Sequence, residues 1–177
     1  MKIIFLDVDG VLNSDKYINY TSKKNIDGIK ADIDVKTIEL LKKALDITGA
    51  KIVLSSSWKN ISRVKDLKEI FKQYGISIDD KTPNINGERG LEIKRYLSEH
   101  RDIEQYLILD DEIFDSFDEE LMQNLILTKE NQGYHGYGNG LQSEHIKQII
   151  ENSEKLKIMK VNIMMSVNKK IILKRRR

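Results

Sequence analysis

Four short apolar runs occur along the chain, and each stops at a residue with an oxygen-bearing side chain. They span 3–6, 52–54, 107–109 and 125–127 and are rich in Ile, Leu and Val. Runs of this length and composition are typical of strands buried in a parallel sheet. Between them, apolar residues recur at helical spacing in stretches that begin near Val35, Val64 and Ile146. The alternation predicts an α/β fold, a three-layer Rossmann-like open parallel sheet with helices on both faces.

In such a sheet the ligand site lies beyond the carboxyl ends of the strands. The residues at these ends are Asp7, Ser55, Asp110 and Thr128, and Asp9, Ser56 and Asp111 lie close behind them. Asp and Ser are also common in turns, because their side chains satisfy nearby backbone groups. An oxygen-bearing side chain at all four ends, with two acidic pairs among them, favours a functional site over turn chemistry.

Three stretches lack clear helical or strand periodicity. We interpret 13–34 as a flap or small hairpin over the site, too short to be a large cap domain. The stretch 75–87, which contains the only proline, is interpreted as a loop with room for one short strand. The stretch 133–140 is rich in glycine and aromatic residues but lacks phosphate-loop spacing.

Composition indicates one compact domain, because 177 residues with 40% hydrophobic content can bury one ordinary core. Cysteine is absent, so any metal must be held by oxygen or histidine. The apolar start of the chain is too short for a signal peptide or a membrane span, so we expect a cytoplasmic protein with no membrane partner.

Charge divides the chain into two parts. Residues 154–177 carry a net charge of +8, whereas the remainder carries −6. We expect a folded domain over 1–152 and a basic C-terminal tail over 153–177. The basic charge of the tail favours a polyanionic partner, and a solvated end is the more ordinary interpretation.

The segment Asp7-Val8-Asp9-Gly10-Val11 resembles motif I of the haloacid dehalogenase (HAD) superfamily of phosphatases. Ser55 resembles its motif II, Arg89 its motif III base, and Asp110-Asp111 followed by Asp115 its acidic motif IV. The resemblance covers about 1–152 and implies an HAD-like fold with minimal or no cap. The strings at 53–58, 88–93 and 109–111 are similar to the small stand-alone HAD domains related to those in RNA-repair proteins.

A phosphate monoester is an anion, so an anionic nucleophile reaches it only when a divalent cation and hydrogen-bonding groups offset the repulsion. The resemblance implies Mg²⁺ as cofactor and Asp7 as a nucleophile that forms an aspartyl-phosphate. Asp9 would then protonate the leaving oxygen and later activate water. Implied metal ligands are Asp7, the backbone carbonyl of Asp9, and Asp110, with Asp111 either a ligand through water or an acid behind the ligands.

The resemblance also implies a phosphate-binding set. Ser55 and the amide of Ser56 would bind the phosphoryl oxygens, and Arg89 would offset charge in the transition state. Lysine is commoner at the motif III position, so Lys59 and Lys94 remain alternatives to Arg89. Three further residues have other expected roles: Asp115 would orient the motif IV loop, Trp58 is expected to pack rather than stack on a base, and His135 is expected to be a loop residue.

The pattern predicts a Mg²⁺-dependent phosphatase acting on a phosphate monoester, with a nucleic-acid end as the first expectation for the substrate. A free nucleotide or a small sugar phosphate is nearly as well supported. The alternative from another class is a non-catalytic phospho-acceptor of the receiver type. The order of the acidic motifs disfavours it, because the second strand ends in Ser55 rather than in an aspartate.

Overall fold

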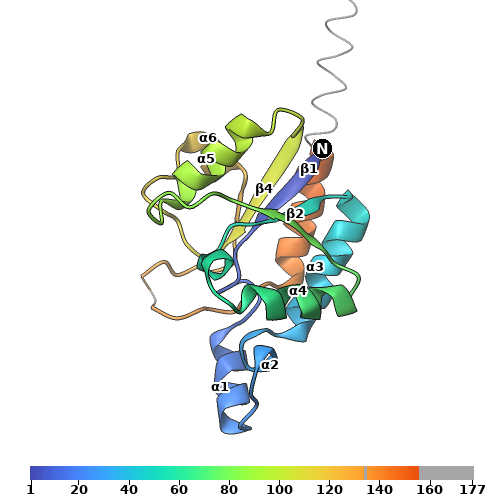
Figure 1. Ribbon diagram of the computed structural model, residues 1–177, viewed down its shortest axis with the longest axis vertical. Coiled ribbons are helices and arrows are strands. Elements are labelled where there is room, and N and C mark those ends of the chain that lie inside the picture. The colour runs from blue at the N-terminus through green and yellow to red at the C-terminus, as the bar shows by residue number, and fades with distance from the viewer. Residues whose placement is uncertain (134, 156–177) are drawn as a thin grey trace, which may run out of the picture.

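The computed structural model describes residues 1–133 and 135–155, which contain a five-stranded, fully parallel sheet in the order β3-β2-β1-β4-β5 (Figure 1). The strands are β1 (Lys2–Leu6), β2 (Lys51–Leu54), β3 (Ile78–Lys81), β4 (Gln105–Asp110) and β5 (Leu125–Leu127). All four apolar runs form strands, as predicted. The fifth strand, β3, lies in the stretch 75–87, where the sequence left room for one short strand, and that expectation is confirmed. Its sequence, Ile-Asp-Asp-Lys, is mostly exposed at the sheet edge, so it lacks an apolar signature.

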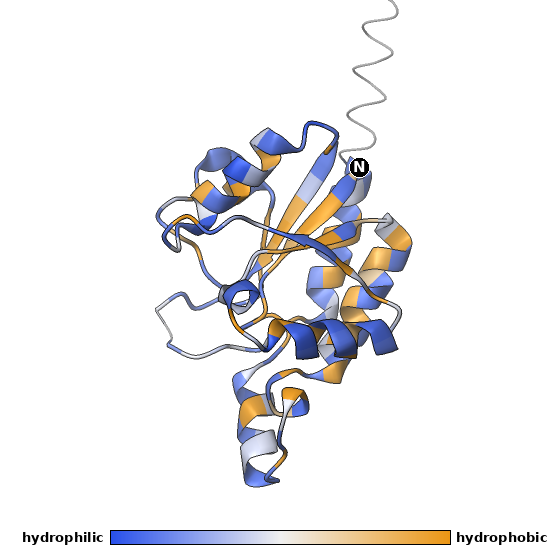
Figure 2. Cartoon of the chain, viewed as in Figure 1, coloured by the Kyte–Doolittle hydropathy of each residue, from blue (hydrophilic) through white to orange (hydrophobic). Residues whose placement is uncertain are grey.

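Helices cover both faces of the sheet, which confirms the predicted fold class (Figure 1). Alternate residues of each strand face opposite sides, so Ile4 and Leu6 join one apolar cluster and Ile3 and Phe5 the other. The first cluster includes α3 (Val35–Thr48), α4 (Val64–Gln73) and a helix over 143–155; the second includes α5 (Arg89–Glu99) and α6 (Glu119–Gln123). The central strands are correspondingly apolar in Figure 2, while the helices carry polar residues on their outer sides.

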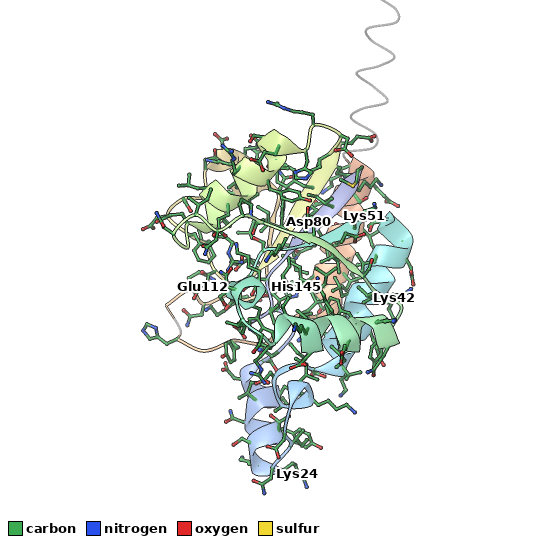
Figure 3. The ribbon with its side chains drawn as sticks, in the orientation of Figure 1. Lys24, Lys42, Lys51, Asp80, Glu112 and His145 are labelled. Carbon is green, nitrogen blue, oxygen red and sulfur yellow. The ribbon has the colours of Figure 1, made fainter. Side chains whose placement is uncertain are left out.

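The flap expected over 13–34 consists of helices rather than a hairpin. It contains α1 (Asp15–Lys23) and the single turn α2 (Ile29–Asp32). The side chain of Ser14 accepts a hydrogen bond from the backbone N–H of Tyr17 and so caps α1 at its start. The flap projects from the end of the molecule toward which the strands run, and Figure 3 shows Lys24 at its tip. It is small, as the sequence predicted.

The predicted tail, 153–177, lies outside the described residues except for its first three. Those three continue the helix over 143–155, and Ser153 is buried against the amide side chain of Gln105 and the amine of Lys2. The boundary at 152 therefore stays a prediction. No helix in the described part of the chain has both the length and the apolar character needed to span a membrane.

Candidate active site

Register places three of the predicted residues side by side. β1 is the central strand, and Leu6 pairs with Leu54 of β2 on one side and with Leu109 of β4 on the other. The next residue along each strand is therefore Asp7, Ser55 or Asp110. Backbone hydrogen bonds continue the ladder to this level, since Asp7 N–H donates to Leu109 at 2.9 Å and Ser55 N–H to Leu6 at 2.8 Å.

Arg89 joins the two buried aspartates. Its Nη1 lies 3.2 Å from Asp7 Oδ1 and 3.1 Å from Asp110 Oδ2. Although burial acts to lower it, the charges of Asp7 and Asp110 raise the pKa of Arg89 above its usual value. Arg89 stands in the first turn of α5, and the next residue, Gly90, lets that turn approach the loop after β4. A Cβ at Gly90 would lie 2.2 Å from the backbone oxygen of Ser116.

The two alternative bases have other partners. Lys59 is buried in an ion pair with Glu92, with Nζ 2.6 Å from Oε2, and also donates to Thr82 and to the Pro83 carbonyl. Lys94 pairs with Asp118 at 2.7 Å on the exposed side of α5. Of the three candidates for the motif III base, Arg89 is the one in contact with Asp7. Asp115 is exposed, and in its loop it is Ser116 that accepts a hydrogen bond, from Gly90 N–H at 3.0 Å.

Three carboxylates converge among the residues described. Asp7, Asp110 and Asp111 each offer an oxygen within 4.8 Å of the others. Burial raises the pKa of Asp7 to about 6, against the pull of Arg89 and a hydrogen bond from Ser56. Burial, followed by the charge of Asp7, also raises the pKa of Asp110 well above its usual range. A cation held by these oxygens would favour their ionised forms, and oxygen donors are what Mg²⁺ prefers, so the residues fit the metal.

Asp111 is held from the side by Lys129, a residue that sequence reasoning missed. Lys129 Nζ lies 3.2 Å from Asp111 Oδ2 and is itself buried. It follows Thr128, the residue at the end of β5, and its position beside a strand end was the available signal. On its other side Asp111 packs on Gly10, where a Cβ would lie 2.3 Å from the carboxylate carbon and where φ is +68°. Glycine at position 10 thus allows the two acidic motifs to touch.

Ser55 presents an unpaired hydroxyl beside these acids. The residue is 1% exposed, and its Oγ has no hydrogen-bond partner among the described residues. A buried hydroxyl without a partner is costly, so a bound group that hydrogen-bonds to it would remove that cost. Ser56, the next residue, accepts a hydrogen bond from the Trp58 N–H and caps the short 3₁₀ helix η1 (Ser57–Asn60).

Comparison with family models gives a match over residues 3–135 to the HAD domain in Swiss Army Knife RNA repair proteins. The chain belongs to this family. Comparisons with curated proteins and with solved structures find no match. The resemblance inferred from the motifs is therefore confirmed, and the HAD domain belongs to a superfamily of hydrolases. The match also favours this family over the receiver alternative. Asp7 directly follows the central strand β1, so its place in the sheet does not itself separate the HAD family from the receiver type.

Asp9 lies outside the group of three acids in this HAD domain. Both of its carboxylate oxygens accept hydrogen bonds, Oδ1 from Asn13 Nδ2 at 3.1 Å and Oδ2 from Trp58 Nε1 at 3.0 Å. Asn13 also uses its Oδ1 to accept from Gly10 N–H at 2.7 Å, which closes the turn of motif I. The sequence predicted packing for Trp58, and its ring is indeed buried, but the bond to Asp9 was missed.

The glycine-rich stretch, of which 133 and 135–140 are described, is hydrogen-bonded to the start of the flap. Asp15 accepts hydrogen bonds from the backbone N–H of Tyr137 at 3.0 Å and of Gly138 at 2.9 Å. At Gly140 a Cβ would lie 2.3 Å from the Asn13 carbonyl. His135 in the same stretch is exposed. The stretch therefore supports the motif I loop from outside.

Proposed function

We propose that this HAD domain is a phosphatase that uses Mg²⁺ and hydrolyses a phosphate monoester through an aspartyl-phosphate on Asp7. The observation that carries the proposal is the buried pair of Asp7 and Asp110 joined by Arg89, with the unpaired Ser55 hydroxyl on the neighbouring strand. Two buried acids, a base and an unpaired hydroxyl thus converge at the end of a parallel sheet where such folds bind ligands.

In the proposed reaction an Asp7 oxygen attacks phosphorus, and the bond from phosphorus to the leaving oxygen breaks. Asp9 gives its proton to that oxygen. A water molecule then attacks the phosphorus of the aspartyl-phosphate, Asp9 takes a proton from the water, and the bond from phosphorus to Asp7 breaks to release inorganic phosphate. Mg²⁺, when bound by Asp7, Asp110 and the Asp9 carbonyl, supplies positive charge that offsets the repulsion between the substrate and Asp7.

The remaining site residues have roles that follow from their contacts. Arg89 keeps Asp7 and Asp110 in fixed positions and carries positive charge where the phosphoryl group reacts. Ser55 and the amide of Ser56 hydrogen-bond the phosphoryl oxygens. Lys129 holds Asp111 behind the metal ligands, so we assign Asp111 the outer position rather than a direct bond to Mg²⁺.

For the substrate we propose a phosphorylated nucleic-acid end. The family's description, the HAD domain in RNA repair proteins, supports it, and so does the small flap, which leaves space for a bulky leaving group. A free nucleotide or a sugar phosphate is the second candidate. A cytoplasmic location and the binding of nucleic acid by the basic tail stay predictions.

The test is release of phosphate from p-nitrophenyl phosphate with and without Mg²⁺, in the wild type, Asp7→Asn and the exposed control Asp66→Asn. We expect Mg²⁺-dependent turnover in the wild type and the control and at least a ~10³-fold loss in Asp7→Asn. Equal rates for the wild type and Asp7→Asn would refute the nucleophile. Stable phosphorylation of Asp7 without turnover would instead favour the receiver alternative. A panel of phosphorylated oligonucleotides, nucleotides and sugars, ranked by kcat/KM, then identifies the substrate class.

A further inference from the structure

Trp58 connects motif II to the proposed acid-base residue. It is the only tryptophan of the chain and lies in η1, three residues after Ser55. Its ring is 5% exposed, and its Nε1 donates to Asp9 Oδ2 at 3.0 Å. A buried indole N–H needs an acceptor, so this carboxylate both satisfies the ring and is held by it.

The hydrogen bond from Trp58 helps to fix the orientation of the Asp9 carboxylate. The other carboxylate oxygen is held by Asn13, which belongs to the same motif I turn. Trp58 comes from the neighbouring β2 side of the sheet, so the two donors fix the carboxylate from two independent segments. With only one of them, the carboxylate could rotate away from the leaving oxygen.

Contacts continue from Trp58 to the flap. The guanidinium carbon of Arg63, the residue before α4, lies 5.3 Å from the centre of the Trp58 ring, a distance typical of cation–π contact. The same guanidinium forms an ion pair with Asp32 in α2. A continuous path therefore runs from the flap through Arg63 and Trp58 to Asp9.

We propose that Trp58 is a positioning residue for the acid-base step, and that Arg63 and Asp32 connect the flap helix to that step through it. This inference rests on the proposed function, because it assigns Trp58 a role in proton transfer by Asp9. It predicts that replacing Trp58 lowers kcat/KM most for substrates whose leaving oxygen must be protonated as it departs. A poor alkoxide leaving group needs this proton, whereas p-nitrophenolate departs without help.

The test compares kcat/KM for p-nitrophenyl phosphate with kcat/KM for an alkyl phosphate, in the wild type and Trp58→Phe. The phenyl ring keeps an aromatic side chain but removes the N–H. We expect the aryl-to-alkyl ratio to rise about tenfold or more in Trp58→Phe, and to rise further in Asp9→Asn. The matched control is Tyr96→Phe. It also removes an aromatic donor to a carboxylate, because the Tyr96 hydroxyl donates to Asp80 Oδ2 at 3.0 Å, but this pair lies outside the site. Its ratio should equal that of the wild type.

The ratio makes the result independent of folding yield, because both substrates are measured on the same sample and a loss of folded protein lowers both rates equally. An unchanged ratio in Trp58→Phe would overturn the inference even if total activity fell. Failure of the proposed function is a separate outcome: in that case the wild type itself shows no turnover that depends on Asp7.

The connection to the flap is tested by Arg63→Gln, which removes both the ring contact and the ion pair. We expect a smaller rise of the ratio, about two- to fivefold, because Arg63 acts through Trp58. In the double variant with Trp58→Phe, the ratio should match that of Trp58→Phe alone. A further, independent rise in the double variant would show that Arg63 reaches the reaction by another route and would overturn the connection. Loss of the ion pair alone, in Asp32→Asn, should shift the ratio in the same direction.

Discussion

Replacing the proposed nucleophile should stabilise the metal-free protein. Burial raises the pKa of Asp7 from its ordinary 3.8 to about 6, so the ionised side chain opposes folding. The difference is about 2 pKa units, and each unit corresponds to about 1.4 kcal/mol, which gives a penalty of about 3 kcal/mol at high pH. Asp7→Asn keeps the size of the side chain and one acceptor oxygen but cannot ionise, so it should avoid this penalty.

Because the pKa of Asp7 is raised in the folded state, the stability gained in Asp7→Asn depends on pH. Below about pH 3 the Asp7 carboxyl is mostly protonated in both the folded and the unfolded state, so it contributes little to the free energy of unfolding. As pH rises from 3.8 through 6, the unfolded chain releases its proton first, and the wild type loses stability relative to Asp7→Asn. The gain in free energy of unfolding should therefore grow from about 0.5 kcal/mol at pH 4 to about 3 kcal/mol at pH 8.

The assay is urea denaturation in EDTA across this pH range, with the exposed Asp66→Asn as control for loss of one negative charge. Adding Mg²⁺ should stabilise the wild type more than Asp7→Asn, since the variant loses a ligand carboxylate. If Asp7→Asn is no more stable than the wild type at pH 8 in EDTA, Asp7 does not carry a desolvated charge and the reasoning fails.

Two further predictions concern residues that hold the site together. Gly10→Ala should destabilise the protein by about 2 kcal/mol or more and lower Mg²⁺-dependent activity, because its Cβ meets Asp111 in addition to the strain of φ +68°. The control Gly28→Ala has a similar φ of +73° but open space around the Cβ, so it measures the backbone strain alone. Thermal melts should show a smaller loss of stability in Gly28→Ala than in Gly10→Ala, and equal losses would contradict a contribution from the contact with Asp111. Glu92→Gln should cost about 3 kcal/mol, because it leaves the buried Lys59 without its carboxylate. Denaturant midpoints check this, and a double variant that replaces both partners with Met and Leu should recover much of the loss; wild-type stability in Glu92→Gln would refute it.

The sequence predicted the fold well because the strands of this sheet are buried on both faces. Apolar runs of only a few residues, such as 3–6 and 125–127, are therefore enough to identify the strands. Because the strands are parallel, their carboxyl ends meet at the same edge of the sheet. For β3 the sequence indicated only room for one short strand within 75–87, without bounds, because an exposed edge strand does not need apolar residues. The helices of the flap were not predicted, because α1 and α2 are short and bury few side chains.

In the site, the residues at the strand ends were predictable from the sequence, but the side chains that hold them in place were not. Asp7 and Asp110 follow apolar runs, so local pattern identified them. Lys129, Asn13 and the indole of Trp58 act through contacts that join distant segments, and no periodicity encodes those. The choice of Arg89 among three basic residues likewise depended on where α5 begins relative to β4.

The buried charges of the site give it a property that separates it from the core around it. Asp7 and Asp110 are desolvated and only partly compensated by Arg89, so neutral replacement of Asp7 should raise stability while activity is lost. Glu92 is equally buried but fully paired with Lys59, so its neutral replacement should lower stability. Opposite effects of the same acid-to-amide change at two buried positions would therefore distinguish an acid selected for chemistry from one that holds the fold.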